Sequence, residues 1–337
     1  MGIKNLLKFL NTFPDLIEEK NINEYSGKKI AIDISILLYQ VVISVRNSGA
    51  DLTNKQGKIT SHILGLFNKT IKLLLKGIIP VYVFDGKPPE IKRKVLDLRK
   101  NIRKKAEEKM AKADSFEDKV KYFKRSVVIT KEQLDECRLL LDYMGVPYIN
   151  APQEADSQCA WLAKKGFVDA VLTEDMDILT FGSPLIIRNL TSFKKKPMEI
   201  NLEKIKSKFG WNQDDFIRFC ILLGCDYSEH ITDYDSFEIF NVFKTDKNID
   251  NTLKKLNKHI SYKEPFEYFK EPIIFSAIDN LDIKKPDFKN LNDLLVNKFG
   301  LIKYKIQNKI NHMIIAYSKI KCLDMKSKHS DKKEQVV

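Results

Sequence analysis

The chain has 337 residues, 43% of them hydrophobic, so it can bury the core of one large domain or two moderate ones. Its 58 lysines and arginines outnumber 45 aspartates and glutamates, and the net charge of +13 favours a polyanionic partner, either nucleic acid or an anionic membrane surface. No apolar run is long enough for a membrane span, and the five cysteines, which form no Cys-x-x-Cys pair, favour a reducing compartment and argue against zinc.

The first part of the chain alternates strand and helix patterns. In chain order we expect a short amphipathic helix and its exit (3–23), a strand (28–34), a helix (35–46), a loop (47–59), a helix with one apolar stripe (61–77) and a strand (81–85). Short β-branched and aromatic runs bounded by turn residues are typical of buried parallel strands. This β–α–β order predicts an α/β fold with a mostly parallel sheet.

Residues 90–125 are crowded with lysine and arginine and contain few large apolar side chains. The one break in the pattern is Asp114-Ser115, so we expect two basic helices that stand away from the core. A solvated helical hairpin without a binding role is the alternative interpretation of such a span.

The second half of the chain returns to alternating elements before becoming helical. We expect a helix (130–144) closed by Gly145, a strand (146–149), a helix from Pro152, strands (167–172 and 185–190) and a helix (217–223). Residues 227–316 read as helical and lysine-rich, and the polar tail from about 319 to 337 reads as disordered.

Carboxylates stand at the ends of several of these apolar runs. The set comprises Asp33, Asp85, Glu154, Asp156, Asp175, Asp177 and Asp226. Ligands of an open α/β sheet lie outside the carboxyl ends of its strands, so acids that end several strands should converge. Clustered carboxylates repel one another unless cations lie among them, and hard divalent ions such as Mg²⁺ prefer oxygen ligands. A single Asp after a strand is more often a helix cap or a turn former, so the prediction depends on the whole set.

Two-metal hydrolysis of a phosphodiester is the chemistry that needs such a set of acids. Two divalent ions roughly 3.5–4 Å apart clamp the scissile phosphate and activate a water for in-line attack. Nearby Lys or Arg side chains then neutralise charge that develops on the phosphate.

The motifs resemble those of flap endonucleases, the structure-specific 5′ nucleases of the eukaryotic and archaeal XPG/Rad2-type family, from Met1 to about Tyr317. The matching segments are Met1-Gly2-Ile3, Ile30-Ala31-Ile32-Asp33, Val83–Pro89, Ala151–Asp156, Thr173–Gly182 and Leu223–Tyr227. The resemblance implies a PIN-like core with a mostly parallel central sheet flanked by helices, a basic helical arch and a helical C-terminal region. It also implies cleavage of 5′ flaps at single-strand/double-strand junctions, with 5′→3′ exonuclease activity, in DNA replication and repair.

The resemblance also implies roles for single residues. All seven acids become ligands of two Mg²⁺ ions, with Mn²⁺ as a substitute, or hold the waters around them; Asp156 stands where relatives usually have Glu. Lys92 and Arg99 match the basic pair that contacts the scissile phosphate, and together with Asp177 they are the expected catalytic residues. The expected DNA contacts are Gly2, Tyr39, Arg46, Lys92, Arg99 and Arg103. Gly2 can lie near the site only if Met1 is removed.

On this basis we divide the chain into five parts. They are the first part of the nuclease core (1–90), the helical arch or gateway (91–131), the second part of the core (132–226), a helical DNA-binding region with a degenerate hairpin (227–317) and a disordered basic tail (318–337).

The chain departs from the family pattern in two places. Relatives hold a monovalent ion with a glycine-rich hairpin after the last motif, whereas residues 229–237 contain no glycine. We therefore do not count K⁺ among the expected cofactors, and we expect altered contact with the downstream duplex. The tail also lacks the peptide pattern with which relatives bind a sliding clamp, so no clamp-binding segment is recognised.

The leading hypothesis is thus a flap endonuclease that acts on branched duplex DNA with a 5′ flap. The alternatives are a processive 5′→3′ exonuclease that acts on nicks and gaps, a catalytically inactive scaffold that binds DNA junctions, and a phosphatase with a nucleophilic Asp. We expect an intracellular, reducing location: the nucleus for a cellular protein, or a cytoplasmic replication site for a viral one. No membrane partner is expected.

Overall fold

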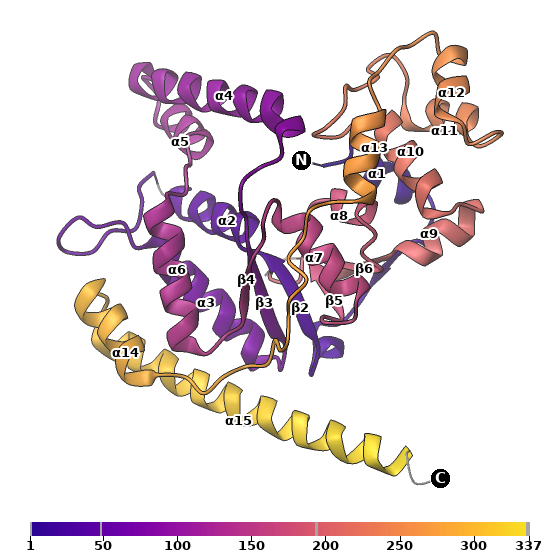
Figure 1. Ribbon diagram of the computed structural model, residues 1–337. Coiled ribbons are helices and arrows are strands. Elements are labelled where there is room, and N and C mark those ends of the chain that lie inside the picture. The colour runs from indigo at the N-terminus through magenta and orange to yellow at the C-terminus, as the bar shows by residue number, and fades with distance from the viewer. Residues whose placement is uncertain (1, 48, 193–194, 335–337) are drawn as a thin grey trace.

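A computed structural model describes residues 2–47, 49–192 and 195–334. Its centre is a seven-stranded sheet with the order β1-β7-β6-β5-β2-β3-β4 (Figure 1). The strands are β1 (Ile17–Glu19), β2 (Lys29–Asp33), β3 (Ile79–Phe84), β4 (Tyr148–Asn150), β5 (Ala170–Leu172), β6 (Leu185–Arg188) and β7 (Met198–Asn201). The pairs from β6 through β5, β2 and β3 to β4 are parallel, and β7 joins β6 and β1 in antiparallel pairs.

Both faces of the sheet are buried, because successive side chains of a strand point to opposite faces. In β2, Ala31 belongs to one apolar core, whereas Ile30 and Ile32 belong to the other. In β3, Val81 and Val83 alternate in the same way with Tyr82 and Phe84. This double burial explains why the central strands are continuous apolar runs in the sequence.

Helices cover each face. The core around Ile30 and Ile32 is closed by α2 (Ile34–Arg46), α3 (Ser61–Leu75), α6 (Lys131–Met144), α14 (Phe288–Asn292), the π-helix η3 (Asp293–Lys298) and α15 (Lys303–Glu334). The core around Ala31 is closed by α1 (Leu6–Leu10), α7 (Ala155–Lys164), α8 (Asp177–Thr180), α9 (Leu202–Phe209), α10 (Gln213–Leu223), α11 (Ser236–Phe243), α12 (Ile249–Lys255) and α13 (Lys263–Lys270). Two short 3-10 helices are η1 (Ile22–Tyr25) and η2 (Glu90–Lys92).

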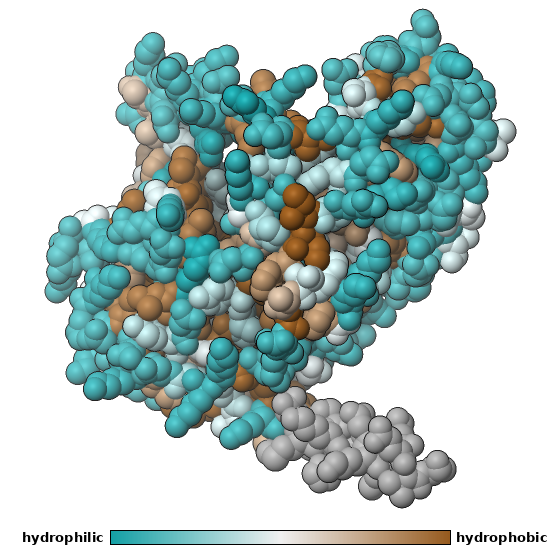
Figure 2. Space-filling view, viewed as in Figure 1, coloured by the Kyte–Doolittle hydropathy of each residue, from teal (hydrophilic) through white to brown (hydrophobic). Residues whose placement is uncertain are grey.

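Two further helices, α4 (Arg93–Lys112) and α5 (Phe116–Arg125), stand above the sheet and form the arch expected from the basic span. They face a lobe made by α11, α12 and α13 (Figure 1). Figure 2 shows a hollow between the arch and this lobe, with mostly hydrophilic residues around its rim. The parallel strands point their carboxyl ends towards this side of the molecule, so residues that follow those strands lie below the hollow.

The structure confirms the α/β fold and the parallel centre of the sheet, but the sequence did not predict the two antiparallel strands. β1 and β7 are only three and four residues long and include half-exposed or exposed glutamates, so neither forms an apolar run. α10 begins four residues before the expected Ile217, because Asn212 and Asp215 form a capping box there.

The C-terminal third differs more from the expectation. Residues 271–287 contain no helix and run in an extended conformation from α13 to α14 (Figure 1). The Gln158 side chain holds this segment, since its amide donates to the Phe275 carbonyl at 2.9 Å and accepts from the Phe275 N–H at 2.7 Å. The tail was expected to be disordered from residue 318, but α15 continues to Glu334, and that stretch contains neither glycine nor proline.

Candidate active site

The ends of β2 and β3 bring the first two acids together. Asp33 is the last residue of β2 and also the N-cap of α2, where its carboxylate accepts from the Ser35 N–H at 2.7 Å. Asp85 follows β3 directly, and it accepts from the Ser35 hydroxyl at 2.6 Å and from the Ala155 N–H at 2.9 Å. Both acids therefore accept hydrogen bonds at a helix N-terminus and also belong to the acid cluster. A capping role and a role in the site are thus compatible for an Asp that follows a strand.

The other acids come from helix starts and one loop. Glu154 is the N-cap of α7 and Asp156 lies in the first turn of α7. Asp175 lies between β5 and α8 and Asp177 is the first residue of α8, and the Asp177 N–H donates to Asp175 Oδ1 at 3.1 Å. Asp226 follows α10. Asp33, Glu154, Asp175 and Asp177 are all less than 9% exposed. Asp156 and Asp226 are half-buried and Asp85 is exposed, so most of the cluster is buried below the arch.

The electrostatics show that the acids share one site. Burial, and then the charge of Asp85, raises the pKa of Asp33 well above its ordinary value. Burial also raises the pKa of Asp156 and of Asp177, and the charge of Asp175 raises both further. Asp226 adds to the shift at Asp177. The cluster therefore holds more negative charge than its surroundings can solvate, and it needs cations to stay ionised.

Lys92 and Arg99 provide part of that positive charge. Lys92 Nζ donates to both carboxylate oxygens of Glu154, at 2.7 and 2.9 Å, and lies 3.9 Å from Asp226. Arg99 Nη2 donates to Asp226 Oδ2. Burial alone would lower the pKa of Lys92, but the charge and hydrogen bond of Glu154 outweigh it and raise the pKa. The arch therefore reaches the acids through the two bases that the sequence singled out.

Two buried oxygens in the cluster have no partner. Among the described residues, Asp156 Oδ1 and Asp177 Oδ1 are buried and accept no hydrogen bond. An unpaired buried carboxylate oxygen is costly, and a bound cation would satisfy it. Within the described part of the chain, no three His, Cys, Asp or Glu side chains are arranged so that they could already hold a metal ion. Lys92 and Arg99 instead pair with two of the acids. The all-oxygen donor set nevertheless fits hard divalent ions.

The N-terminus lies against the same acids. A Cβ at Gly2 would stand 1.9 Å from Asp175 Oδ1 and 3.2 Å from Asp177 Oδ1, and Gly2 has a φ of +84°. The Lys4 N–H also donates to the Gly224 carbonyl at 2.9 Å, which ties this end of the chain to the loop that carries Asp226. Gly2 thus occupies the position expected for it, whereas Met1 lies outside the described residues.

We predict that Gly2→Ala lowers the single-turnover rate by about a hundredfold, because displacing a carboxylate by about 1 Å misaligns the site. The matched control is Gly27→Ala, since Gly27 has a φ of +86° but a Cβ there would meet no atom within 4 Å. Gly27→Ala should cost stability through backbone strain and leave the rate unchanged. Equal rate losses in the two variants would show that backbone strain, and not contact with Asp175, causes the effect.

The remaining expected DNA contacts lie on α2 and α4. Tyr39 is half-buried on α2, which begins beside Asp33, and Arg103 is half-buried on α4, one turn beyond Arg99. Arg46 is the last residue of α2 and is bound by Asp51 and by the backbone of α5. The structure therefore brings Gly2, Lys92 and Arg99 to the acids, and it places Arg46 against α5, at the other end of the arch.

Sequence reasoning missed three residues that hold the acids in place. The Tyr227 hydroxyl donates to Glu154 Oε2, the Ser35 hydroxyl donates to Asp85, and Arg188 holds Glu174, next to Asp175. Arg188 donates to the Glu174 carbonyl at 2.6 Å and pairs with its carboxylate at 2.8 Å. Tyr227 directly follows Asp226, and Ser35 lies two positions after Asp33, so closeness to a predicted acid in the sequence is the signal that could have identified them.

Tyr227→Phe should raise the Mg²⁺ concentration needed for half-maximal activity about tenfold, because residues that orient a metal ligand contribute to its affinity. The rate at saturating Mg²⁺ should change much less. The matched control is Tyr148→Phe, which removes a 3.3 Å hydrogen bond to Asp142 on α6. A magnesium titration of both variants checks this prediction, and an unchanged midpoint for Tyr227→Phe would contradict it.

Residues 229–237, the glycine-free stretch, form a loop and the start of α11. Asp235 caps α11 by accepting from the Phe237 and Glu238 N–H groups, and Asp233 pairs with Lys258. Among the described residues, those with a positive φ outside glycine are Asn5, Asn189, Lys247 and Asn257. The backbone of this loop therefore has no position that requires glycine, and its two aspartates have partners within the lobe.

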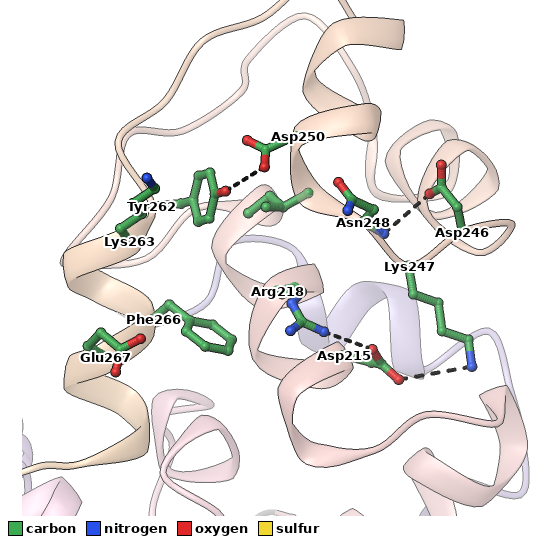
Figure 3. Close-up of a pocket in the computed structure, with 11 residues that line it drawn as sticks. Asp215, Arg218, Asp246, Lys247, Asn248, Asp250, Tyr262, Lys263, Phe266 and Glu267 are labelled. Carbon is green, nitrogen blue, oxygen red and sulfur yellow. Dashed lines mark hydrogen bonds and ion pairs between the residues drawn. The ribbon is translucent and has the colours of Figure 1, made fainter.

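A separate pocket of about 770 Å³ lies in the same lobe, between α10, α12 and α13 (Figure 3). Arg218 and Lys247 approach Asp215 from two sides, and the Tyr262 hydroxyl donates to Asp250 at 2.8 Å. None of the predicted site residues lines this pocket. Its charged groups join the helices of the lobe to one another, and the reactive acids lie elsewhere.

Comparisons with known proteins agree with this geometry. Residues 1–106 match the XPG N-terminal domain and residues 145–226 match the XPG I-region. Flap endonuclease 1 of Glycine max is 41% identical over 95% of this chain and 88% of its own length, and that of Homo sapiens is 42% identical over 84% and 78%.

Solved structures show the same relation. The flap endonuclease-1 from Methanococcus jannaschii matches with a TM-score of 0.72 and 33% identity, covering 90% of this chain and 96% of that one. The catalytic core of Rad2 in complex with a DNA substrate matches with a TM-score of 0.70 and 23% identity over 93% of this chain, which shows a shared fold. None of the described helices is both long and apolar enough to cross a membrane.

Proposed function

The chain belongs to the flap endonuclease family and is a structure-specific nuclease, and from the site we propose that it cuts 5′ flaps with two Mg²⁺ ions held by the seven clustered acids. The observation that carries this proposal is the convergence of acids from the ends of β2 and β3, the start of α7 and the segment from β5 into α8, most of them buried, below two bases of the arch. Mn²⁺ is expected to substitute for Mg²⁺.

The ligands proposed for the two ions are Asp33, Asp85, Glu154, Asp156, Asp175, Asp177 and Asp226. The unpaired Asp156 Oδ1 and Asp177 Oδ1 support this assignment, since they are buried carboxylate oxygens without a hydrogen-bond donor in the described part of the protein. Ions bound there would lower the pKa of an attacking water and stabilise the leaving oxygen. Asp156 has a side chain one methylene shorter than the Glu usual in the family, and it keeps the negative charge.

Lys92 and Arg99 act on the substrate phosphate. In the protein without DNA both bases pair with acids, Lys92 with Glu154 and Arg99 with Asp226. A scissile phosphate entering the site competes for the same donors, and it gains most as charge develops on its oxygens. Tyr227 and Ser35 meanwhile fix the orientations of Glu154 and Asp85 through their hydroxyl groups.

The arch provides contacts for the 5′ strand of the flap. α4 and α5 together carry many exposed lysines, and they stand beside the hollow seen in Figure 2. Phosphate contacts with such a surface make binding strongly dependent on salt. Tyr39 on α2 and Arg103 on α4 are the proposed contacts for the strand near the cut, and an aromatic ring there would stack on a base of any sequence.

We also propose how the C-terminal region binds DNA and where the protein acts. The helical region after Asp226 binds the downstream duplex without a K⁺ site, since residues 229–237 carry no glycine. The five cysteines are free, which suits a reducing intracellular location, in the nucleus or at a cytoplasmic replication site. We assign no sliding-clamp segment.

Cleavage of labelled substrates tests the proposal. A 5′-flap duplex in Mg²⁺ should be cut at the junction faster than a nicked or gapped duplex, and replacing Na⁺ with K⁺ should change the rate little. Faster degradation from nicks and gaps would favour the processive exonuclease. Junction binding without any cutting would favour the inactive scaffold.

A further inference from the structure

Arg46 is the last residue of α2 and lies against the end of α5, which is the end of the arch away from Lys92 and Arg99. Its Nε and Nη2 donate to the two carboxylate oxygens of Asp51, both at 3.0 Å. Its Nη1 donates to the Phe123 carbonyl in α5 at 2.8 Å, and the guanidinium carbon lies 3.9 Å from the centre of the Phe123 ring. The side chains of Arg46 and Asp51 are each only 12% exposed. The guanidinium is therefore enclosed by protein on one face and along its donor edge.

We propose that Arg46 is a positioning residue that anchors the α5 end of the arch to α2. This role replaces the DNA contact expected for Arg46 from the sequence, because a phosphate could reach these donors only by displacing Asp51 and the Phe123 carbonyl. The inference rests on the proposed function only for the role of the arch, which is to align Lys92 and Arg99 with the phosphate. The anchor itself is a property of the DNA-free protein.

Neighbouring contacts strengthen the same junction. Lys124 Nζ donates to Asn47 Oδ1 at 3.0 Å, so the residues after Arg46 and after Phe123 are also joined. The Phe116 ring at the start of α5 lies over Gly49, where an added Cβ would come within 2.8 Å of it. Residues at the start of the loop between α2 and α3 therefore contact both the beginning and the end of α5.

This anchor gives the arch two fixed ends. The α4 end is held at the acids by Lys92 and Arg99, and the α5 end is held at α2 by Arg46. α2 is capped by Asp33 and carries Tyr39, so one helix links the acid cluster to the foot of the arch. A loose α5 end would let α4 tilt, and the two bases would then lose their alignment with the phosphate.

The chemistry of the anchor makes clear predictions about substitutions. Lysine keeps the charge of Arg46 but cannot form the two parallel bonds to Asp51 or stack flat on Phe123. Arg46→Lys should therefore fail to rescue the anchor. Asp51→Asn removes the acceptor charge and leaves Arg46 in place, so it should act like Arg46→Gln although it leaves the protein with more net positive charge.

Hydrogen exchange of the DNA-free protein tests the anchor without any nuclease activity. Backbone amides of α5 should exchange about tenfold faster in Arg46→Gln, Arg46→Lys and Asp51→Asn, and the double variant should be no worse than the singles. Lys55→Ala, which removes one exposed charge from the same loop, should leave exchange unchanged. Asp51→Asn is the mildest change and remains informative if substitution of Arg46 prevents folding, and thermal melts report on that.

The salt dependence of junction binding distinguishes an anchor from a phosphate ligand. For an anchor, Arg46→Gln keeps the slope of affinity against salt and lowers the single-turnover rate on a 5′ flap about tenfold, with Asp51→Asn matching it. A slope reduced by about one in Arg46→Gln, with normal α5 exchange and normal Asp51→Asn, would overturn the proposal. A wild-type protein that cuts no flap would refute the proposed function and leave the exchange result standing.

Discussion

Asp177→Ala should lower the rate of flap cleavage by at least about a thousandfold, because the two-metal clamp provides several kcal/mol of transition-state stabilisation. Asp177 is 2% exposed, has an unpaired buried oxygen and lies beside Asp175 in the centre of the cluster. Single-turnover cleavage of a labelled 5′-flap duplex measures the loss. Binding of the same duplex should remain, since the arch and the helical lobe keep their charges.

The control for this prediction is Glu203→Ala. Glu203 is an acid on α9 whose side chain is 67% exposed and pairs with Lys206. Its loss should leave the rate unchanged, because it removes a surface ion pair of little energetic value. If Asp177→Ala kept more than about a tenth of the wild-type rate, the metal would not depend on this acid and the assignment of the cluster would be wrong.

Substitution of Asp177 should also show how much the acid cluster destabilises the metal-free folded protein. Burial and the charge of Asp175 raise the pKa of Asp177, so the folded protein holds its proton to a higher pH than the unfolded chain does. This contribution to stability is present at low pH and is lost as the pH rises through the folded pKa. Asp177→Asn should therefore stabilise the metal-free protein near neutral pH by about 0.5–2 kcal/mol, and by less in acid.

Chemical unfolding in EDTA across a pH series measures this difference. Added Mg²⁺ should reduce or reverse it, because the ion binds the wild-type folded state more tightly. A variant that was less stable than the wild type at every pH without metal would show that the acids are not under electrostatic strain.

Replacing both arch bases should lower the cleavage rate by about 10²–10³-fold for each base lost, as for other groups that stabilise charge in a transition state. Lys92 is nearly enclosed, with 12% of its side chain exposed, and Arg99 meets Asp226 from the next turns of α4. Arg99→Lys should not restore the full rate, because a lysine cannot reproduce the planar fork of arginine. Single-turnover rates of Lys92→Ala, Arg99→Ala and Arg99→Lys at saturating Mg²⁺ test this.

Lys100→Ala is the matched control, since Lys100 is exposed on α4 beside Arg99. It should weaken binding at high salt and leave the single-turnover rate within about threefold, as expected for a simple phosphate contact. Equal losses for Lys100→Ala and Arg99→Ala would mean that the arch contributes only general positive charge.

The sequence predicted the centre of the fold because burial on both faces leaves a clear signal. Ile30 and Ile32 face one core while Ala31 faces the other, so β2 is an uninterrupted apolar run that ends at Asp33. The edge strands β1 and β7 lacked this signal, since they are short and partly exposed. The extended segment 271–287 was missed because its position depends on tertiary bonds, such as those from Gln158 to Phe275, which leave no periodic pattern.

The site was predictable to a similar degree. The acids and the two bases occur within short motifs, and the structure brings Gly2, Lys92 and Arg99 to the acids. Sequence alone does not distinguish an arginine that binds DNA from one that holds protein, and only the structure shows that Arg46 pairs with Asp51 and the Phe123 carbonyl. Nor could it show that Tyr227 orients Glu154, because that contact joins residues 73 positions apart.

Location of the bound ions tests the central claim most directly. A crystal of the full chain with a 5′-flap duplex and Mn²⁺ in place of Mg²⁺ would reveal the ions by their anomalous scattering. We predict two ions within direct or water-mediated reach of Asp33, Asp85, Glu154, Asp156, Asp175, Asp177 and Asp226, below Lys92 and Arg99. Ions bound elsewhere, or flap cleavage that persists with no ion among these acids, would contradict the account.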